Sequence, residues 1–226
     1  MSLALTDIQV ADKRREFDRL APFYDLLARL GSLGTVGRIY ATVARLAGGG
    51  EHAIDLCCGT GGVTRALARL FGRVTGVDLS PRMLARAERR QPDGARLVQG
   101  DLLRVPLEPA DAVTCAFGLH ELPPLARGGL FHRAASLLRP GGRLVVCDYR
   151  RPPGRLWRLL ARLLRPYVER QHFLGFLDED LVALAAGAGL VLVEERRLLA
   201  GTVQILAFER DGGGWRSVSW CVTDAP

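Results

Sequence analysis

The chain has 226 residues, of which 48% are hydrophobic, and a formal net charge of +7. This length suits one α/β domain that buries its core without a metal or disulfide, so we expect a single domain over residues 1–210 and a loose tail over 211–226. The sequence has no apolar run near 18 residues and no leader pattern, which argues against a membrane-spanning protein and predicts a cytoplasmic one.

The positive charge comes almost entirely from arginine, because Lys13 is the only lysine among 31 basic residues. An arginine-rich composition without a lysine-rich tail or a recognisable nucleic-acid module does not favour nucleic acid as a partner. The five cysteines form no C-x-x-C pair, so no metal site is expected.

Residues 10–48 are expected to form an N-terminal helical cap. Within them Phe17–Leu27 reads FDRLAPFYDLL and is richer in aromatic side chains than a linker needs. One interpretation is that Phe23 and Tyr24 simply pack a helix onto the domain.

Strand-like and helix-like patterns alternate from residue 52 to residue 150, which is typical of a parallel sheet with helices on both faces. The predicted strands are 52–57, 73–78, 95–99, 111–116 and 142–149, and the predicted helices are 62–71, 81–91 and 124–138. A helix over 178–188 and two late strands, Leu190–Leu198 and Thr202–Glu209, complete the pattern.

A glycine turn follows the first predicted strand in Ala53–Gly62, AIDLCCGTGG. Glycine at positions 59 and 61 lets the backbone bend and its N–H groups approach a ligand. Asp78 ends the second strand, where a carboxylate can accept both ribose hydroxyls. Gly59–Thr64 lacks the last glycine of G-x-G-x-x-G, so a nicotinamide cofactor is disfavoured.

Ligands of open α/β sheets bind at the carboxyl edge of the strands. Asp55, Asp78, Asp101 and Phe117 all lie at or near the ends of predicted strands. We therefore expect these four residues to meet in one crevice.

Four stretches in this order, DLCCGTGG, GVDLSPRML, QGDL and LRPGGRL, resemble the motifs of the class I S-adenosylmethionine (SAM) methyltransferases. The resemblance implies a Rossmann-like, seven-stranded, mostly parallel sheet with an antiparallel C-terminal hairpin, and SAM as the cofactor with S-adenosylhomocysteine as the product. The cofactor-binding residues that it implies are Tyr24, Asp55, Cys57, Gly59, Thr60, Gly61, Asp78, Leu79, Met83, Asp101, Leu102 and Phe117.

The N-terminal stretch is similar to the F-D-x-x-A-x-x-Y-D opening of the ubiquinone and menaquinone C-methyltransferases. This similarity implies a small, lipophilic, quinol-like acceptor and a cofactor contact for Tyr24. Those enzymes usually carry an arginine and an asparagine where this chain has His120 and Glu121.

His120 is the first catalytic candidate, because it directly follows the predicted strand 111–116 and histidine can accept a proton near pH 7. An alternative is that His120 caps the next helix or bonds a backbone carbonyl. Tyr149, at the end of a strand, and His172, in a lid expected over 150–178, are the other candidates.

Residues 155–165, RLWRLLARLLR, place leucines on one helical face and arginines on the other, which suits peripheral contact with an anionic inner membrane face. The same pattern also fits an ordinary surface helix. Two further functions remain open: a phospholipid head-group N-methyltransferase, and a protein that binds SAM without catalysis. The oligomeric state is not assigned.

Overall fold

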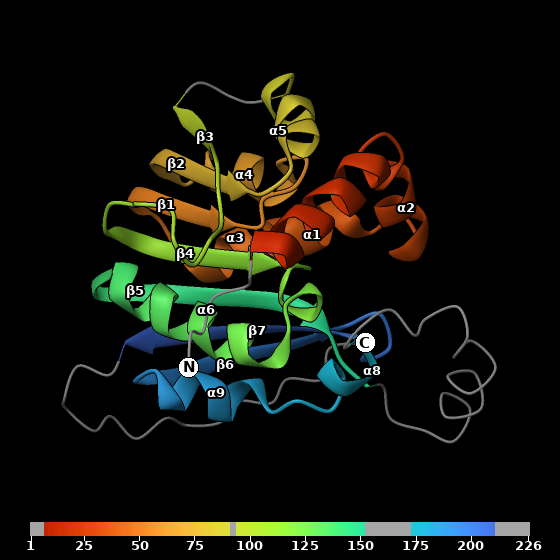
Figure 1. Cartoon of the computed structure of the whole chain (residues 1–226). Coiled ribbons are helices and arrows are strands. Elements are labelled where there is room, and N and C mark those ends of the chain that lie inside the picture. The colour runs from red at the N-terminus through yellow and green to blue at the C-terminus, as the bar shows by residue number, and fades with distance from the viewer. Residues whose placement is uncertain (1–6, 91–93, 152–172, 211–226) are drawn as a thin grey trace.

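The computed structural model describes residues 7–90, 94–151 and 173–210. A seven-stranded sheet in the order β3-β2-β1-β4-β5-β7-β6 forms the middle layer (Figure 1). The neighbours from β3 to β5 are parallel, whereas β7 is antiparallel to β5 and β6. The strands are β1 Gly50–Leu56, β2 Phe71–Asp78, β3 Ala95–Gln99, β4 Ala110–Ala116, β5 Leu138–Tyr149, β6 Leu190–Leu198 and β7 Val203–Arg210. The predicted fold class is confirmed.

Strand β5 begins at Leu138, four residues before the predicted start at 142. Leu138 pairs with Ala110 and Arg143 with Ala112, so a register shift lies between these pairs. Gly141 within the shift has φ +76°, a backbone conformation that side chains disfavour. The structure therefore continues β5 through this irregularity, so that the strand is longer than predicted.

Helices cover both faces of the sheet. On one face, α3 (Val36–Ala47) and α4 (Gly62–Leu67) pack with inward residues such as Ala112 and Val145. On the other, α6 (Pro124–Leu137) and α9 (Leu181–Gly187) pack with Val113 and Leu144. Successive strand residues thus feed two separate cores, as the alternation of side chains along a strand requires.

The N-terminal helices α1 (Asp7–Leu20) and α2 (Tyr24–Gly31) lie outside these layers (Figure 1). Asp18 of α1 accepts a 2.6 Å hydrogen bond from Ser80 Oγ, the N-cap of α5 (Pro81–Glu88) after β2. Lys13 of α1 forms an ion pair with Glu121 in η1 (Leu119–Glu121), one turn of 3-10 helix after β4. Helix α1 is therefore fixed across the carboxyl ends of two parallel strands.

Several predicted features lie outside the described residues, and the structure does not test them. These are the amphipathic segment 155–165, most of the lid expected over 150–178, His172, and the tail 211–226. One further element, α8 (Phe173–Phe176), follows that gap.

Candidate active site

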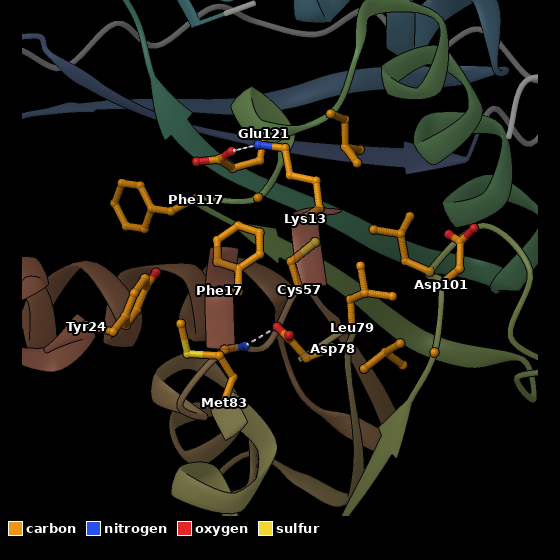
Figure 2. Close-up of a pocket in the computed structure, with 16 residues that line it drawn as sticks. Lys13, Phe17, Tyr24, Cys57, Asp78, Leu79, Met83, Asp101, Phe117 and Glu121 are labelled. Carbon is orange, nitrogen blue, oxygen red and sulfur yellow. Dashed lines mark hydrogen bonds and ion pairs between the residues drawn. The ribbon is translucent and has the colours of Figure 1, made fainter. Parts of the chain in front are cut away.

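A cavity opens at the carboxyl ends of β1, β2, β3 and β4, beside α1 (Figure 2). Its empty volume is about 770 Å³, a figure that includes space open to solvent. Nine of the twelve predicted cofactor residues line it: Tyr24, Cys57, Gly59, Asp78, Leu79, Met83, Asp101, Leu102 and Phe117. Residues that the sequence interpretation missed also line it: Lys13, Phe17, Val77, Gly100, Gly118, Glu121 and Leu122.

The loop after β1 is held open by positive φ angles at Cys57 (+59°), Gly59 (+55°) and Gly61 (+77°). This conformation turns the Gly59 N–H toward Asp78 Oδ2, to which it donates at 2.8 Å, and Ser80 N donates to Asp78 Oδ1 at 2.9 Å. Burial raises the pKa of Asp78, and the backbone hydrogen bonds oppose that rise. Each carboxylate oxygen has a second lone pair, so Asp78 can still accept two hydroxyl donors of a ribose.

Asp101 also lines the cavity, in the loop after β3. Its Oδ1 accepts the Leu103 N–H at 2.9 Å. Its Oδ2 is buried and accepts no hydrogen bond from any described residue, with Arg104 Nε 3.7 Å away. A buried acceptor without a donor is costly, and the amino group of an adenine would satisfy it. The cavity residues therefore fit a nucleoside cofactor.

Three predicted cofactor residues do not line this cavity. Asp55 is buried, and its two oxygens accept hydrogen bonds from Thr64 Oγ1 (2.6 Å) and Thr114 Oγ1 (2.8 Å). Burial raises its pKa to about 6, against the effect of those two hydroxyls. Asp55 and Thr60 instead line a smaller cavity that shares Tyr24 and Cys57 with the main one. Gly61 precedes α4 and forms the turn.

Lys13 and Phe17, both on α1, lie among the side chains that line the cavity (Figure 2). Burial would raise the pKa of Glu121, but its contacts with His120 and Lys13 lower it to about 2. Glu121 is therefore an ionised carboxylate on the cavity wall. The only feature of the sequence that could have drawn attention to Lys13 is that it is the single lysine of the chain.

His120 lies behind Glu121 rather than on the cavity wall. Its Nδ1 is 2.7 Å from Asp148 Oδ1, and its Nε2 is 3.4 Å from Glu121 Oε1. Burial would lower the pKa of His120, but Asp148 and Glu121 raise it to about 10. The ring is therefore protonated at neutral pH, and it can act as a general base only after losing that proton.

Aromatic rings surround His120. The ring centroid of Tyr149 is 5.1 Å and that of Phe173 is 5.5 Å from the imidazole, and Tyr149 also lies 5.2 Å from Phe117. Burial, followed by the charge of Asp148, raises the pKa of Tyr149 to about 12. The structure thus places Tyr149 beside His120 but not among the cavity-lining residues, and both catalytic assignments stay predictions.

Comparisons with known proteins agree with this geometry. Residues 53–142 match the family model described as "Methyltransferase domain". A "Demethylmenaquinone methyltransferase" of Thermobifida fusca (strain YX) is 34% identical over 241 residues, covering 97% of this chain and 93% of the relative. The chain belongs to the class I SAM-dependent methyltransferases.

A "Demethylmenaquinone methyltransferase" of Tropheryma whipplei (strain Twist) is 35% identical, and that match covers 70% of this chain but just under two thirds, 66%, of the relative. The N-methyltransferase NodS from Bradyrhizobium japonicum WM9, in complex with S-adenosylhomocysteine, has a TM-score of 0.61 at 19% identity, covering 77% of this chain and 87% of NodS. At that identity the likeness concerns the fold alone.

Membership of this methyltransferase family confirms the enzyme class and the cofactor expected from the sequence. None of the helices in the described ranges combines the length and hydropathy needed to cross a bilayer. Across 7–90, 94–151 and 173–210, no group of three His, Cys, Asp or Glu side chains is arranged to hold a metal ion.

Proposed function

We propose that this methyltransferase methylates a small, lipid-soluble, quinol-like acceptor at carbon. The observation that carries the proposal is the match along 97% of the chain to a protein named demethylmenaquinone methyltransferase. The cavity supports it, because apolar side chains such as Phe17, Leu79, Leu102 and Phe117 supply much of the wall and suit an aromatic acceptor.

In this proposal Asp78 holds the ribose hydroxyls and Asp101 Oδ2 accepts the adenine amino group. The turn from Cys57 to Gly61 lies beside the rest of the cofactor, and the N–H groups of Cys58, Gly59 and Gly61 hold its shape by donating within the protein. When bound, SAM supplies a methyl group already activated by its sulfonium. The residues of this chain mainly align the acceptor with that methyl group and exclude water.

Next to the bound quinol, the Glu121 carboxylate accepts a hydrogen bond from a hydroxyl group of the quinol. Four groups of alternating charge stand in a row there: Lys13, Glu121, His120 and Asp148. Because Asp148 holds the His120 ring as a cation, His120 acts as a positioning residue that fixes Glu121. Tyr149 and Phe173 pack on the imidazole and keep it in place.

The experiment is a comparison of acceptors with methyl-labelled SAM. Demethylmenaquinol with a shortened tail and phosphatidylethanolamine are offered separately to the purified protein, and label on each is counted. Label on the quinol supports the proposal, whereas label on the phospholipid alone replaces it with head-group N-methylation. Label on neither, with S-adenosylhomocysteine binding intact, contradicts the quinol proposal and favours a binding protein.

The Glu121 assignment is tested with Glu121→Gln. We expect kcat for the quinol to fall about tenfold or more, because an orienting hydrogen bond to a charged group is weakened. The matched control is Glu108→Gln, since Glu108 also pairs with a basic residue, Arg73, but is absent from the cavity wall. An equal fall in both variants would contradict the role of Glu121.

A further inference from the structure

Helix α2 exposes an unusual row of large apolar side chains. Phe23, just before the helix, and Leu33, just after it, are 62% and 84% exposed, and Leu26, Leu27 and Leu30 between them are 52–64% exposed. Positions 23, 26, 27 and 30 follow helical spacing and share one face, and Leu33 lies just beyond the end of the helix; we call these five residues the α2 stripe. They make up half of the large exposed apolar side chains found on the described surface.

The orientation of α2 is the reverse of that of an ordinary surface helix. Its polar side faces the protein: Asp25 accepts a 2.6 Å hydrogen bond from Thr60 Oγ1 and pairs with Arg90 Nη1 at 2.8 Å. Tyr24 on the same side lines the main cavity. Because the inner side is fixed by these contacts, the apolar side cannot turn inward without breaking them.

In the sequence, the charged residues that flank the α2 stripe are mostly arginines. Between residues 19 and 50, Asp25 is the only acidic residue, and it is paired on the inner side. The basic residues Arg19, Arg29, Arg38 and Arg45 are all exposed. This pattern fits an anionic surface, and it disfavours a second copy of this chain, whose own arginines would be brought close to these.

We propose that the α2 stripe docks on an anionic lipid bilayer. Exposed leucines and a phenylalanine, flanked by arginines, are the composition that inserts at the boundary between head groups and acyl chains. In Figure 1, α2 lies at the periphery of the molecule, beyond α1, so the stripe can approach a flat surface. This site is distinct from the segment 155–165 considered from the sequence.

Docking through α2 brings the cavity to the bilayer, because Phe23 belongs to the stripe and the adjacent Tyr24 lines the cavity. A lipid-soluble acceptor then moves from bilayer to cavity without crossing water. This transfer of the acceptor rests on the proposed function, whereas binding of the α2 stripe to a bilayer does not. Docking and methyl transfer are therefore measured separately.

The test uses the full chain and vesicles of phosphatidylcholine alone or mixed with phosphatidylglycerol. The probe variant is Leu26→Gln with Leu30→Gln. The matched control is Leu125→Gln with Val191→Gln, which removes apolar side chains of similar exposure, 57% and 44%, from α6 and β6. We expect the partition coefficient onto mixed vesicles to fall at least about tenfold in the probe and to stay near wild type in the control.

Charge is tested with Arg29→Gln and Arg38→Gln, which we expect to weaken binding to the mixed vesicles and to reduce its salt dependence. The proposal would be overturned if the wild type did not bind the vesicles. It would also be overturned if the leucine variant, Leu26→Gln with Leu30→Gln, bound them as well as the wild type does, and the membrane contact would then lie elsewhere, for instance at 155–165. Dimerisation that is lost in the leucine variant would overturn it in favour of a second copy.

Methyl transfer to a water-soluble, tail-less quinol keeps the two proposals apart. The leucine variant should retain wild-type turnover with this acceptor and lose turnover with a vesicle-borne one. If neither the wild type nor the leucine variant methylates any quinol, but only the wild type binds the mixed vesicles, the proposed function is wrong and the proposed docking surface is supported.

Discussion

The imidazole of His120 lies 2.7 Å from Asp148, with Nδ1 facing Oδ1. The other carboxylate oxygen of Asp148 accepts the backbone N–H groups of Leu119 and His120 at 2.9 and 3.2 Å. One buried carboxylate at the end of β5 thus fixes both the backbone of η1 and the ring that it carries. The position of Glu121 on the cavity wall depends on this arrangement.

The charge on His120 should be visible as a dependence of stability on pH. Its pKa is raised from about 6.5 to about 10 in the folded protein, so its stabilising contribution is fully present below pH 6.5 and is lost as the pH rises through 10. Urea unfolding should therefore show His120→Gln to be most destabilising near pH 6 and less so near pH 10.

The control for this measurement is His132→Gln, because His132 is exposed on α6. The His120 resonance is assigned by its absence from the NMR spectrum of His120→Gln, and its titration near pH 6.5 in the wild type would refute the cationic state of His120.

Asp78 should be essential for cofactor affinity. Asp78→Ala removes a charged hydrogen-bond acceptor, and we expect the binding free energy of S-adenosylhomocysteine to weaken by about 1.5 to 3 kcal/mol in calorimetry. The variant also leaves the N–H groups of Gly59 and Ser80 without their acceptor, so the loop itself should become less ordered.

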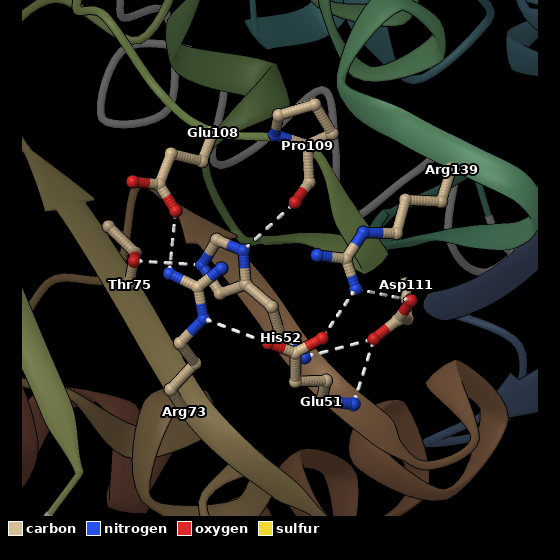
Figure 3. A network of polar contacts seen from close by, with 8 residues as sticks. All are labelled: Glu51, His52, Arg73, Thr75, Glu108, Pro109, Asp111 and Arg139. Atoms are coloured by element: carbon tan, nitrogen blue, oxygen red, sulfur yellow. Dashed lines mark hydrogen bonds and ion pairs between the residues drawn. The ribbon is translucent and has the colours of Figure 1, made fainter.

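The chain offers a matched control at the other end of the sheet, in the polar network of Figure 3. Asp111 Oδ2 also accepts two backbone N–H groups, from Glu51 (2.8 Å) and His52 (2.9 Å), and Arg139 pairs with Asp111 Oδ1 at 3.0 Å. Asp111→Ala should lower thermal stability but leave cofactor affinity unchanged. Equal losses of affinity in both variants would mean that Asp78 acts only through stability.

The ion pair between Lys13 and Glu121 should couple α1 to η1. Both side chains are mostly buried, 22% and 25% exposed, so a double-mutant cycle of Lys13→Met and Glu121→Gln should give a coupling of about 0.5 to 2 kcal/mol in the free energy of unfolding. The coupling should shrink little at 0.5 M salt, because partly buried pairs are weakly screened. Strict additivity of the two substitutions would show that the pair does not hold α1.

The sequence predicted the part of the site that local patterns determine. Asp78 and the Gly59 turn were found because strand ends and glycines carry a local signature, and parallel strands bring their ends together. Lys13 was missed because its partner is 108 positions away, and no periodicity in α1 indicates that contact.

The protonation state of His120 was likewise beyond local reasoning. Its sequence position suggested a base with a pKa near 7, whereas the buried Asp148, 28 positions later, holds it as a cation. Asp55 resembles a ligand in its motif, but Thr64 and Thr114 occupy its oxygens. In both residues, a contact with a residue distant in the sequence sets the protonation state or occupies the hydrogen-bonding atoms, and local sequence patterns do not indicate such a contact.

The lipid solubility of the acceptor is tested by incubating the protein with methyl-labelled SAM and a total cell extract and counting label in the organic and aqueous phases. We expect label in the organic phase that requires the protein and falls strongly in Asp78→Ala. Label confined to the aqueous phase would contradict the lipid-soluble acceptor.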